Sequence, residues 1–183
     1  QLLSSPDEEA TKAAVHVLSQ ADEDAAKPYE NLVSNSSGFF KVLITGAPEP
    51  MGSRLIRGLM EAAEHFWKGK KGRKPSIVNE LQKVSILKSV TTTQAVDLIK
   101  SLQAELAKSQ CPGILLVFDE LGKFLEYEAR HYGANDIYLL QALAEHACKG
   151  ERVNLLVFAL LHQSFEQYAK GLGESLKNEW SKV

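Results

Sequence analysis

Three short apolar runs, each bounded by glycine, proline or polar residues, predict three β-strands. They cover residues 39–45 (FFKVLIT), 114–118 (ILLVF) and 155–161 (LLVFALL). Between the runs, apolar residues recur at intervals of three and four positions, which is the spacing of amphipathic helices. Because the runs are mostly apolar without alternation and helices separate them, the pattern predicts an α/β fold. We expect a three-layer α-β-α sandwich with a mainly parallel sheet.

The same spacing predicts where the helices lie. An early helix carries Ala10, Ala14, Val17 and Leu18 on one face, and residues 20–38 are expected to form a loop with room for a short helix. The remaining helices are expected over residues 53–68, 76–88, 91–106, 135–147 and from Ser164, where a capping box begins. Residues 1–183 are interpreted as one domain, in which 68–110 form a basic loop and a helical insertion.

Composition narrows the class of protein. The 183 residues include 21 Lys+Arg and 23 Asp+Glu, and this net charge of −2 excludes a protein that is basic throughout, as a histone-like coat would be. The longest of the apolar runs, 155–161, is far shorter than the roughly 18 residues that a membrane span needs. Cys111 and Cys148 have no zinc-like spacing to the histidines. Two free thiols favour a reducing cytoplasm.

The residues directly after the strands are the first candidates for chemistry. In a parallel α/β sheet, ligands bind beyond the carboxyl ends of the strands. Asp119 and Glu120 follow the second apolar run directly. A carboxylate that leaves a buried strand is costly unless it binds a cation or finds donors, so one of the two can hold a metal while the other polarises a water. The alternative is an ordinary strand end that leads into an acidic helix start.

The segment ILLVFDE (114–120) resembles the Walker B motif of P-loop NTPases, in the branch with an additional catalytic glutamate that includes the AAA+ and STAND-type ATPases. By this resemblance, Asp119 matches the aspartate that holds Mg²⁺ through a coordinated water. Glu120 matches the glutamate that orients or deprotonates the attacking water. The segment NLLVFALLHQ (154–163) resembles the sensor strand of the same branch, and His162 and Gln163 stand where a polar residue approaches the γ-phosphate.

The chain has no Walker A motif, G-x-x-x-x-G-K-[ST], to bind the phosphates. The nearest segment, 46–54 (GAPEPMGSR), has its glycines one residue too far apart, two prolines that lack N–H donors, and Arg54 where a lysine is required. An ordinary strand-to-helix turn is the better interpretation of this segment. Since residue 1 is Gln, we expect the chain to begin after its own phosphate loop and to lack the first strand of the sheet. Alone, it is then expected to bind ATP·Mg weakly or not at all and to be inactive.

Two other segments were weighed. Five cations within 68–74 favour a solvated loop over a nucleic-acid site, because no aromatic residues are interleaved for base stacking. Residues 123–132 combine charges and aromatics, which fits either a partner-facing element or an amphipathic helix with Phe124 and Tyr127 packed. His16, His65 and His146 are expected on exposed helical surfaces.

These observations lead to a functional hypothesis. The chain is expected to be part of an ATP-binding and ATP-hydrolysing P-loop domain whose cofactors are ATP and Mg²⁺. Its expected partners are the nucleotide and either a protein or a second copy of itself, with weaker support for nucleic acid and none for a membrane. The alternative is a non-catalytic α/β protein-interaction domain, in which Asp119 and Glu120 merely end a strand.

Overall fold

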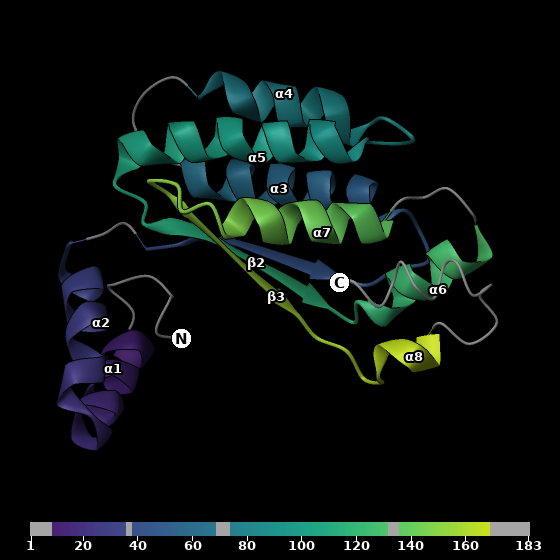
Figure 1. Cartoon of the computed structure of the whole chain (residues 1–183). Coiled ribbons are helices and arrows are strands. Elements are labelled where there is room, and N and C mark those ends of the chain that lie inside the picture. The colour runs from purple at the N-terminus through teal and green to yellow at the C-terminus, as the bar shows by residue number, and fades with distance from the viewer. Residues whose placement is uncertain (1–8, 36–37, 69–73, 132–135, 169–183) are drawn as a thin grey trace.

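The computed structural model describes residues 9–35, 38–68, 74–131 and 136–168. These residues form an α/β structure around a three-stranded sheet in the order β1-β2-β3 (Figure 1). Both strand pairs are parallel, as expected from the sequence. The segments 1–8 and 69–73, to which the first helix start and most of the basic loop belong, lie outside the described residues.

The strands are β1 (Phe40–Thr45), β2 (Gly113–Asp119) and β3 (Asn154–Ala159). All three begin within one residue of the predicted positions, but β3 ends two residues earlier than its apolar run. β2 is the central strand: Ile44 of β1 pairs with Phe118, and Phe118 pairs with Ala159 of β3. This register brings the carboxyl ends of the three strands to the same edge of the sheet.

Four helices lie on one side of the sheet: α3 (Met51–Trp67), α4 (Ser76–Ser85), α5 (Thr92–Leu106) and α7 (Asp136–Ala147). α3, α5 and α7 pack against the strands, and α4 packs on α3 and α5. Figure 1 shows them together on the same side of the strands. The core between them is fully buried and apolar; its largest members include Phe40, Phe118, Phe124, Ile44, Met51, Leu55, Ile56, Leu59, Ile77, Leu81, Ile99 and Leu102. Each Å² of apolar surface that this layer removes from water contributes about 25 cal/mol to the free energy of folding, so the layer is the main stabilising contribution.

Local signals explain where α5 begins. The Thr91 hydroxyl accepts a hydrogen bond from the backbone N–H of Gln94, and the Gln94 side chain accepts one from the backbone N–H of Thr91. This capping box satisfies two helix-terminal donors that would otherwise lack a partner. A short 3₁₀ turn, Ala107–Ser109, ends the helix before Gln110, whose φ of 53° turns the chain toward β2.

The amino-terminal region differs from the prediction. Residues 20–38 were expected to be mainly a loop, but they contain the helix α2 (Glu23–Asn35), which pairs with α1 (Glu9–Ala21) as a hairpin beside the amino end of the sheet (Figure 1). Asp22 starts α2 by accepting a hydrogen bond from the N–H of Ala25. The interior Pro28 and the polar composition hid this helix from the sequence pattern.

The apolar face expected for α1 is wrong for Val17, whereas Ala14 and Leu18 are partly buried. Val17 is 64% exposed, whereas the neighbouring Val15 is buried. The reason is that α1 packs against α2 and not against the sheet, so its buried face is set by a partner helix that the sequence pattern did not predict.

The second face of the sheet has no helical layer among the described residues. Side chains on β1 alternate between buried and exposed, and Leu43 is 66% exposed. Leu43 pairs with Val117, which pairs with Phe158, so the three side chains form one row on this face. Phe158 is 53% exposed. A parallel α/β sheet is therefore established, while the third layer of the expected sandwich stays a prediction.

Two short helices complete the described structure at the carboxyl edge of the sheet. α6 (Gly122–Arg130) follows β2 after a two-residue turn, and α8 (Phe165–Tyr168) follows β3. Phe124 of α6 is fully buried, and its ring meets Phe118 edge to face at 6.5 Å between centroids. The amphipathic interpretation of residues 123–132 is therefore correct for Phe124, while residue 132 lies outside the described residues.

Candidate functional site

Backbone hydrogen bonds join the three strands beyond their regular ends. The N–H of Gly46 donates to the carbonyl oxygen of Asp119 at 2.8 Å, and the N–H of Leu160 donates to that of Phe118 at 2.8 Å. The N–H of Leu121 donates back to the carbonyl oxygen of Leu160 at 3.1 Å. The segment that follows β2 is thus fixed between the segments that follow β1 and β3.

Glu120 has an unusual backbone conformation at the centre of this edge. Its φ is +55°, a left-handed value that non-glycine residues rarely adopt. Gly46 makes room for it, because a Cβ on Gly46 would lie 2.1 Å from the carbonyl oxygen of Glu120. Sparsely populated backbone conformations of this kind are concentrated at functional sites. Gly46 is a site residue that the sequence analysis placed only in a poor phosphate loop.

Two basic side chains lie near the Glu120 carboxylate. Lys123, in the first turn of α6, donates a hydrogen bond to Oε2 of Glu120 at 2.6 Å, and Nε2 of His162 lies 4.0 Å from Oε1. The hydrogen bond from Lys123 is the largest influence and lowers the pKa of the Glu120 carboxyl below its usual value; burial opposes it, and the charges of Lys123 and His162 add to the lowering. Glu120 is therefore ionised at neutral pH.

Asp119 is the last residue of β2, and its side chain is half-buried. It pairs with Thr45 at the end of β1, so both side chains lie on the face of the sheet opposite α3–α7. No group of three or more His, Cys, Asp or Glu that could hold a metal occurs among the residues described. Mg²⁺ in phosphate-transfer sites commonly takes only one or two carboxylates, with substrate oxygens and waters as its other ligands. Asp119 and Glu120 are compatible with that mode of binding. They are too few to form a metal centre built from protein ligands alone.

α8 packs against the start of α6, directly after the turn that carries Glu120. A Cβ on Gly122 would lie 2.3 Å from the ring and hydroxyl oxygen of Tyr168, so the tyrosine packs directly on the start of α6. This contact links the segment after β3 to the turn that carries Glu120. The sequence analysis missed both residues, since a glycine one turn after a strand and a tyrosine in a short helix give no distinctive signal.

His162 and Gln163 lie in the segment between β3 and α8, and both are exposed. The structure brings His162 to Glu120, although its side chain remains 72% exposed. Gln163 follows His162 in the chain, but the described structure shows no hydrogen bond or ion pair between Gln163 and Glu120.

The segment 46–54 is a strand-to-helix turn whose polar side chains are engaged elsewhere. Glu49 forms a close ion pair with Arg57 on α3. The Ser53 hydroxyl lies 3.4 Å from the carbonyl oxygen of Lys88, and Arg54 lies 4.0 Å from Glu61. These contacts support the interpretation of this segment as an ordinary turn.

A second polar cluster lies at the opposite end of β3. His146 was expected on an exposed helical surface, but this was wrong: it is 3% exposed, and its Nε2 lies 2.7 Å from Oε1 of Gln103. Gln103 is also buried and donates through Nε2 to the carbonyl oxygen of Val153 at 2.6 Å. Apolar neighbours on α5 and α7 concealed this pairing, because it joins residues 43 positions apart.

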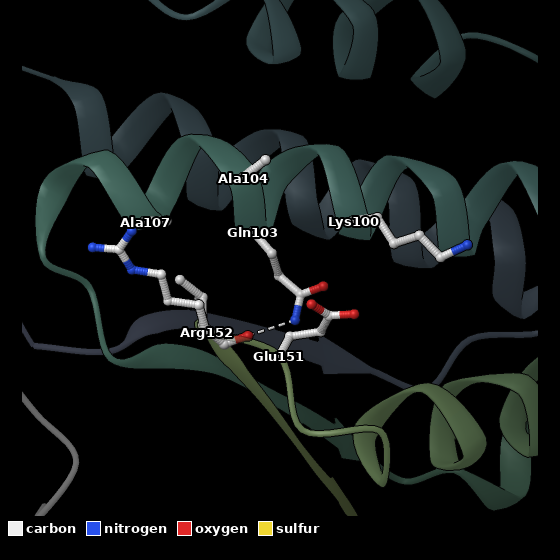
Figure 2. A pocket seen from close by; sticks show the side chains of 7 residues that line it. Lys100, Gln103, Ala104, Ala107, Glu151 and Arg152 are labelled. Atoms are coloured by element: carbon white, nitrogen blue, oxygen red, sulfur yellow. Dashed lines mark hydrogen bonds between the residues drawn. The ribbon is translucent and has the colours of Figure 1, made fainter.

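A cavity of about 350 Å³ adjoins this second cluster. Figure 2 shows Gln103 at its back, with Lys100 on α5 at one side and the segment of Glu151 and Arg152 below. Ala104, Ala107 and Val153 supply the apolar part of the lining. The cavity lies at the amino end of β3, remote from Asp119 and Glu120, and the sequence analysis did not predict it.

Comparison with known protein families, curated proteins and solved structures found no match to this chain. Among the described residues, no helix has the length and apolar character needed to cross a membrane. Both cysteines are free thiols, Cys111 buried and Cys148 exposed.

Proposed function

We propose that these residues form part of an NTP-hydrolysing domain in which the edge formed by Thr45, Asp119 and Glu120 holds Mg²⁺ and orients a water. The observation that carries the proposal is the position of two adjacent carboxylates at the carboxyl end of the central parallel strand, where α/β sheets bind ligands. The neighbouring segment after β3 contributes His162 to the same place. The resemblance of 114–120 to a Walker B motif is the reason for proposing a nucleotide as the substrate and a P-loop NTPase as the class of enzyme.

Each carboxylate has a separate role in the proposed reaction. Asp119, in line with the strand, binds Mg²⁺ directly or through a water, and Mg²⁺ supplies charge neutralisation for the phosphates. Glu120 leaves the strand in another direction because of its positive φ, and its ionised carboxylate accepts a hydrogen bond from the attacking water. Hydrolysis is favoured over transfer to another hydroxyl because the proposed base acts on water.

The phosphate loop is the part of the proposed site that these 183 residues do not supply. Residues 46–54 do not fit that role, since Glu49, Ser53 and Arg54 are engaged with α3 and the carbonyl of Lys88. The proposal therefore requires a glycine-rich anion-binding loop from elsewhere. β3 is an edge strand among the described residues, and its outer edge is available for a further strand of the expected sandwich.

Thermal unfolding with nucleotide tests the proposal. In a protein that carries these residues together with the phosphate loop that the proposal requires, Mg²⁺·ATP is expected to raise Tm, because a ligand that binds only the folded state stabilises it. Asp119→Asn should weaken the shift seen with Mg²⁺·ATP far more than the shift seen with ATP and EDTA. Equal shifts in both conditions, or none in the unsubstituted protein, would contradict the proposal.

A second candidate, a protein-interaction domain, is favoured by the apolar row of Leu43, Val117 and Phe158, in which Leu43 and Phe158 are exposed and Val117 is partly buried. Parallel sheets are ordinarily covered on both faces, so this row is expected to meet another surface. The same thermal measurement separates the candidates: the interaction domain predicts no stabilisation by nucleotide with or without Mg²⁺.

A further inference from the structure

We propose that the buried pair of Gln103 and His146 is an acid-sensitive latch that fastens the start of β3 to α5 and α7. The proposal is independent of the nucleotide site. It rests on a chain of two hydrogen bonds that connects three elements: His146 of α7 to Gln103 of α5, and Gln103 to the carbonyl of Val153, which directly precedes β3.

The hydrogen bonds fix the orientation of the Gln103 amide and the tautomer of the His146 imidazole. Nε2 of Gln103 must be the amide nitrogen, because it lies 2.6 Å from a carbonyl oxygen and can only donate there. Oε1 of Gln103 is then the acceptor that faces His146, so Nε2 of the imidazole carries its hydrogen. In the neutral ring, Nδ1 is consequently the nitrogen without a proton.

Nδ1 of His146 is the weak point of the latch. In the described part of the chain, this nitrogen is buried and has no hydrogen-bond partner. Protonation would place a hydrogen and a positive charge on Nδ1 without an acceptor, which is costly in a buried position. The neutral ring is therefore the form that the closed arrangement accommodates.

The charged groups around His146 come from α5 and from the segment between α7 and β3. Lys100 on α5 and Lys149 after α7 disfavour a charged imidazole, while Glu151 favours it. Burial is the largest influence and, with the two lysines, it lowers the pKa of His146 below its usual value. Arg152 lines the adjoining cavity and adds a further positive charge to this region.

The cavity provides the path by which the latch opens. Gln103, Glu151 and Val153 all line it, so water and the Glu151 carboxylate lie close to the hydrogen bonds of the latch. When His146 gains a proton, we infer that the ring leaves Gln103 and moves toward solvent and Glu151, whose charge favours the protonated imidazole. The carbonyl of Val153 then loses the anchor that Gln103 provides, and the start of β3 separates from the helices.

The direction of the pH effect follows from linkage. A histidine whose pKa is lower in the folded than in the unfolded state binds fewer protons when folded, so stability falls as pH drops below about 6.5, the usual histidine value. Each unit by which folding lowers this pKa corresponds to about a tenfold loss in the folding equilibrium constant at acid pH.

The test compares urea unfolding at pH 7.5 and pH 5.5 in the 183-residue chain, its His146→Gln variant and the control His65→Gln. His65 is an exposed residue of α3. The unsubstituted chain and the control should lose stability at pH 5.5, whereas His146→Gln should lose clearly less relative to its own value at pH 7.5. Amide protection at Leu155 and Leu156 should decrease at acid pH before protection at Val42 does.

Direct titration of the imidazole keeps the proposal falsifiable even if His146→Gln fails to fold. Histidine ¹³C NMR of the unsubstituted chain should give His146 a pKa below 6.5. A value at or above 6.5, an unchanged pH dependence in His146→Gln, or uniform loss of amide protection across all three strands would overturn the latch.

Discussion

Gly46 and Glu120 meet at the carboxyl edge of the sheet so closely that a Cβ on Gly46 would lie 2.1 Å from the Glu120 carbonyl oxygen. This contact explains how Glu120 can leave β2 with a φ of +55° while β1 stays paired with β2 through the N–H of Gly46. The pair thus sets the direction of the Glu120 side chain. The proposed site depends on this backbone contact as much as on the carboxylates.

Gly46→Ala should therefore disturb the site and the fold. The methyl group meets backbone atoms that cannot rotate away, and we expect a loss of about 1–3 kcal/mol in the free energy of unfolding, measured in urea. Gly58→Ala is the matched control, because its Cβ would meet side chains and no backbone, Ile44 at 3.1 Å and Val42 at 3.4 Å, and alanine favours the helix by about 1 kcal/mol. Equal costs for the two substitutions would show that the contact with Glu120 is not specific.

Gly122→Ala should displace Tyr168 from the start of α6. A Cβ there would lie 2.3 Å from the aromatic ring, so α8 must move away or the turn after β2 must shift. We expect faster amide exchange in residues 165–168 and a lower stability. In a Tyr168→Ala background the same glycine substitution should cost much less, since the clashing ring is gone. Additive effects in this double-mutant cycle would contradict the direct contact.

Lys123→Met should raise the pKa of Glu120 toward the ordinary value of a glutamate. The substitution removes the hydrogen bond that is the main cause of the lowered pKa and also one of the two nearby positive charges. In the unsubstituted protein, the contribution of this pair to stability is lost as pH falls through the lowered pKa, below 4.5. Carboxyl ¹³C NMR measures the change, and Lys100→Met, on the remote face of α5, should leave Glu120 unaffected.

Gln103→Leu should destabilise the protein by about 1–3 kcal/mol, because it leaves the carbonyl of Val153 and Nε2 of His146 buried without their partner. Chemical denaturation at pH 7.5 measures this loss. Adding His146→Leu to Gln103→Leu should cost less than His146→Leu does alone, since the imidazole donor is already unpaired. A double variant whose losses simply add would indicate that the two side chains act separately.

The sequence was sufficient for those features that depend on local patterns. The three strands and the helices α3, α5 and α7 all follow from apolar spacing and helix-terminal residues. Strand ends in a parallel sheet share an edge, so the approach of His162 to Glu120 was also foreseeable.

Features that depend on distant pairing were not predictable in the same way. The α1–α2 hairpin buries Val15 because of a partner helix, and His146 is buried because Gln103 meets it across two helices. Glycines at close contacts, such as Gly46 and Gly122, have no periodicity that distinguishes them from loop glycines. In each case, the role of the residue depends on a neighbour in space that is distant in the sequence.

The most direct test of the central claim, that Asp119 and Glu120 form a Mg²⁺-dependent nucleotide-hydrolysing site, is steady-state ATP turnover. It is measured in a protein that carries these residues together with the required phosphate loop, and in its Glu120→Gln variant. Glu120→Gln keeps the size of the side chain but removes the charge that polarises water, so turnover should fall by at least about 100-fold while bound ATP is retained. The 183 residues alone should show no turnover. Turnover that is equal in the variant and the unsubstituted protein, or absent from both, would contradict the account.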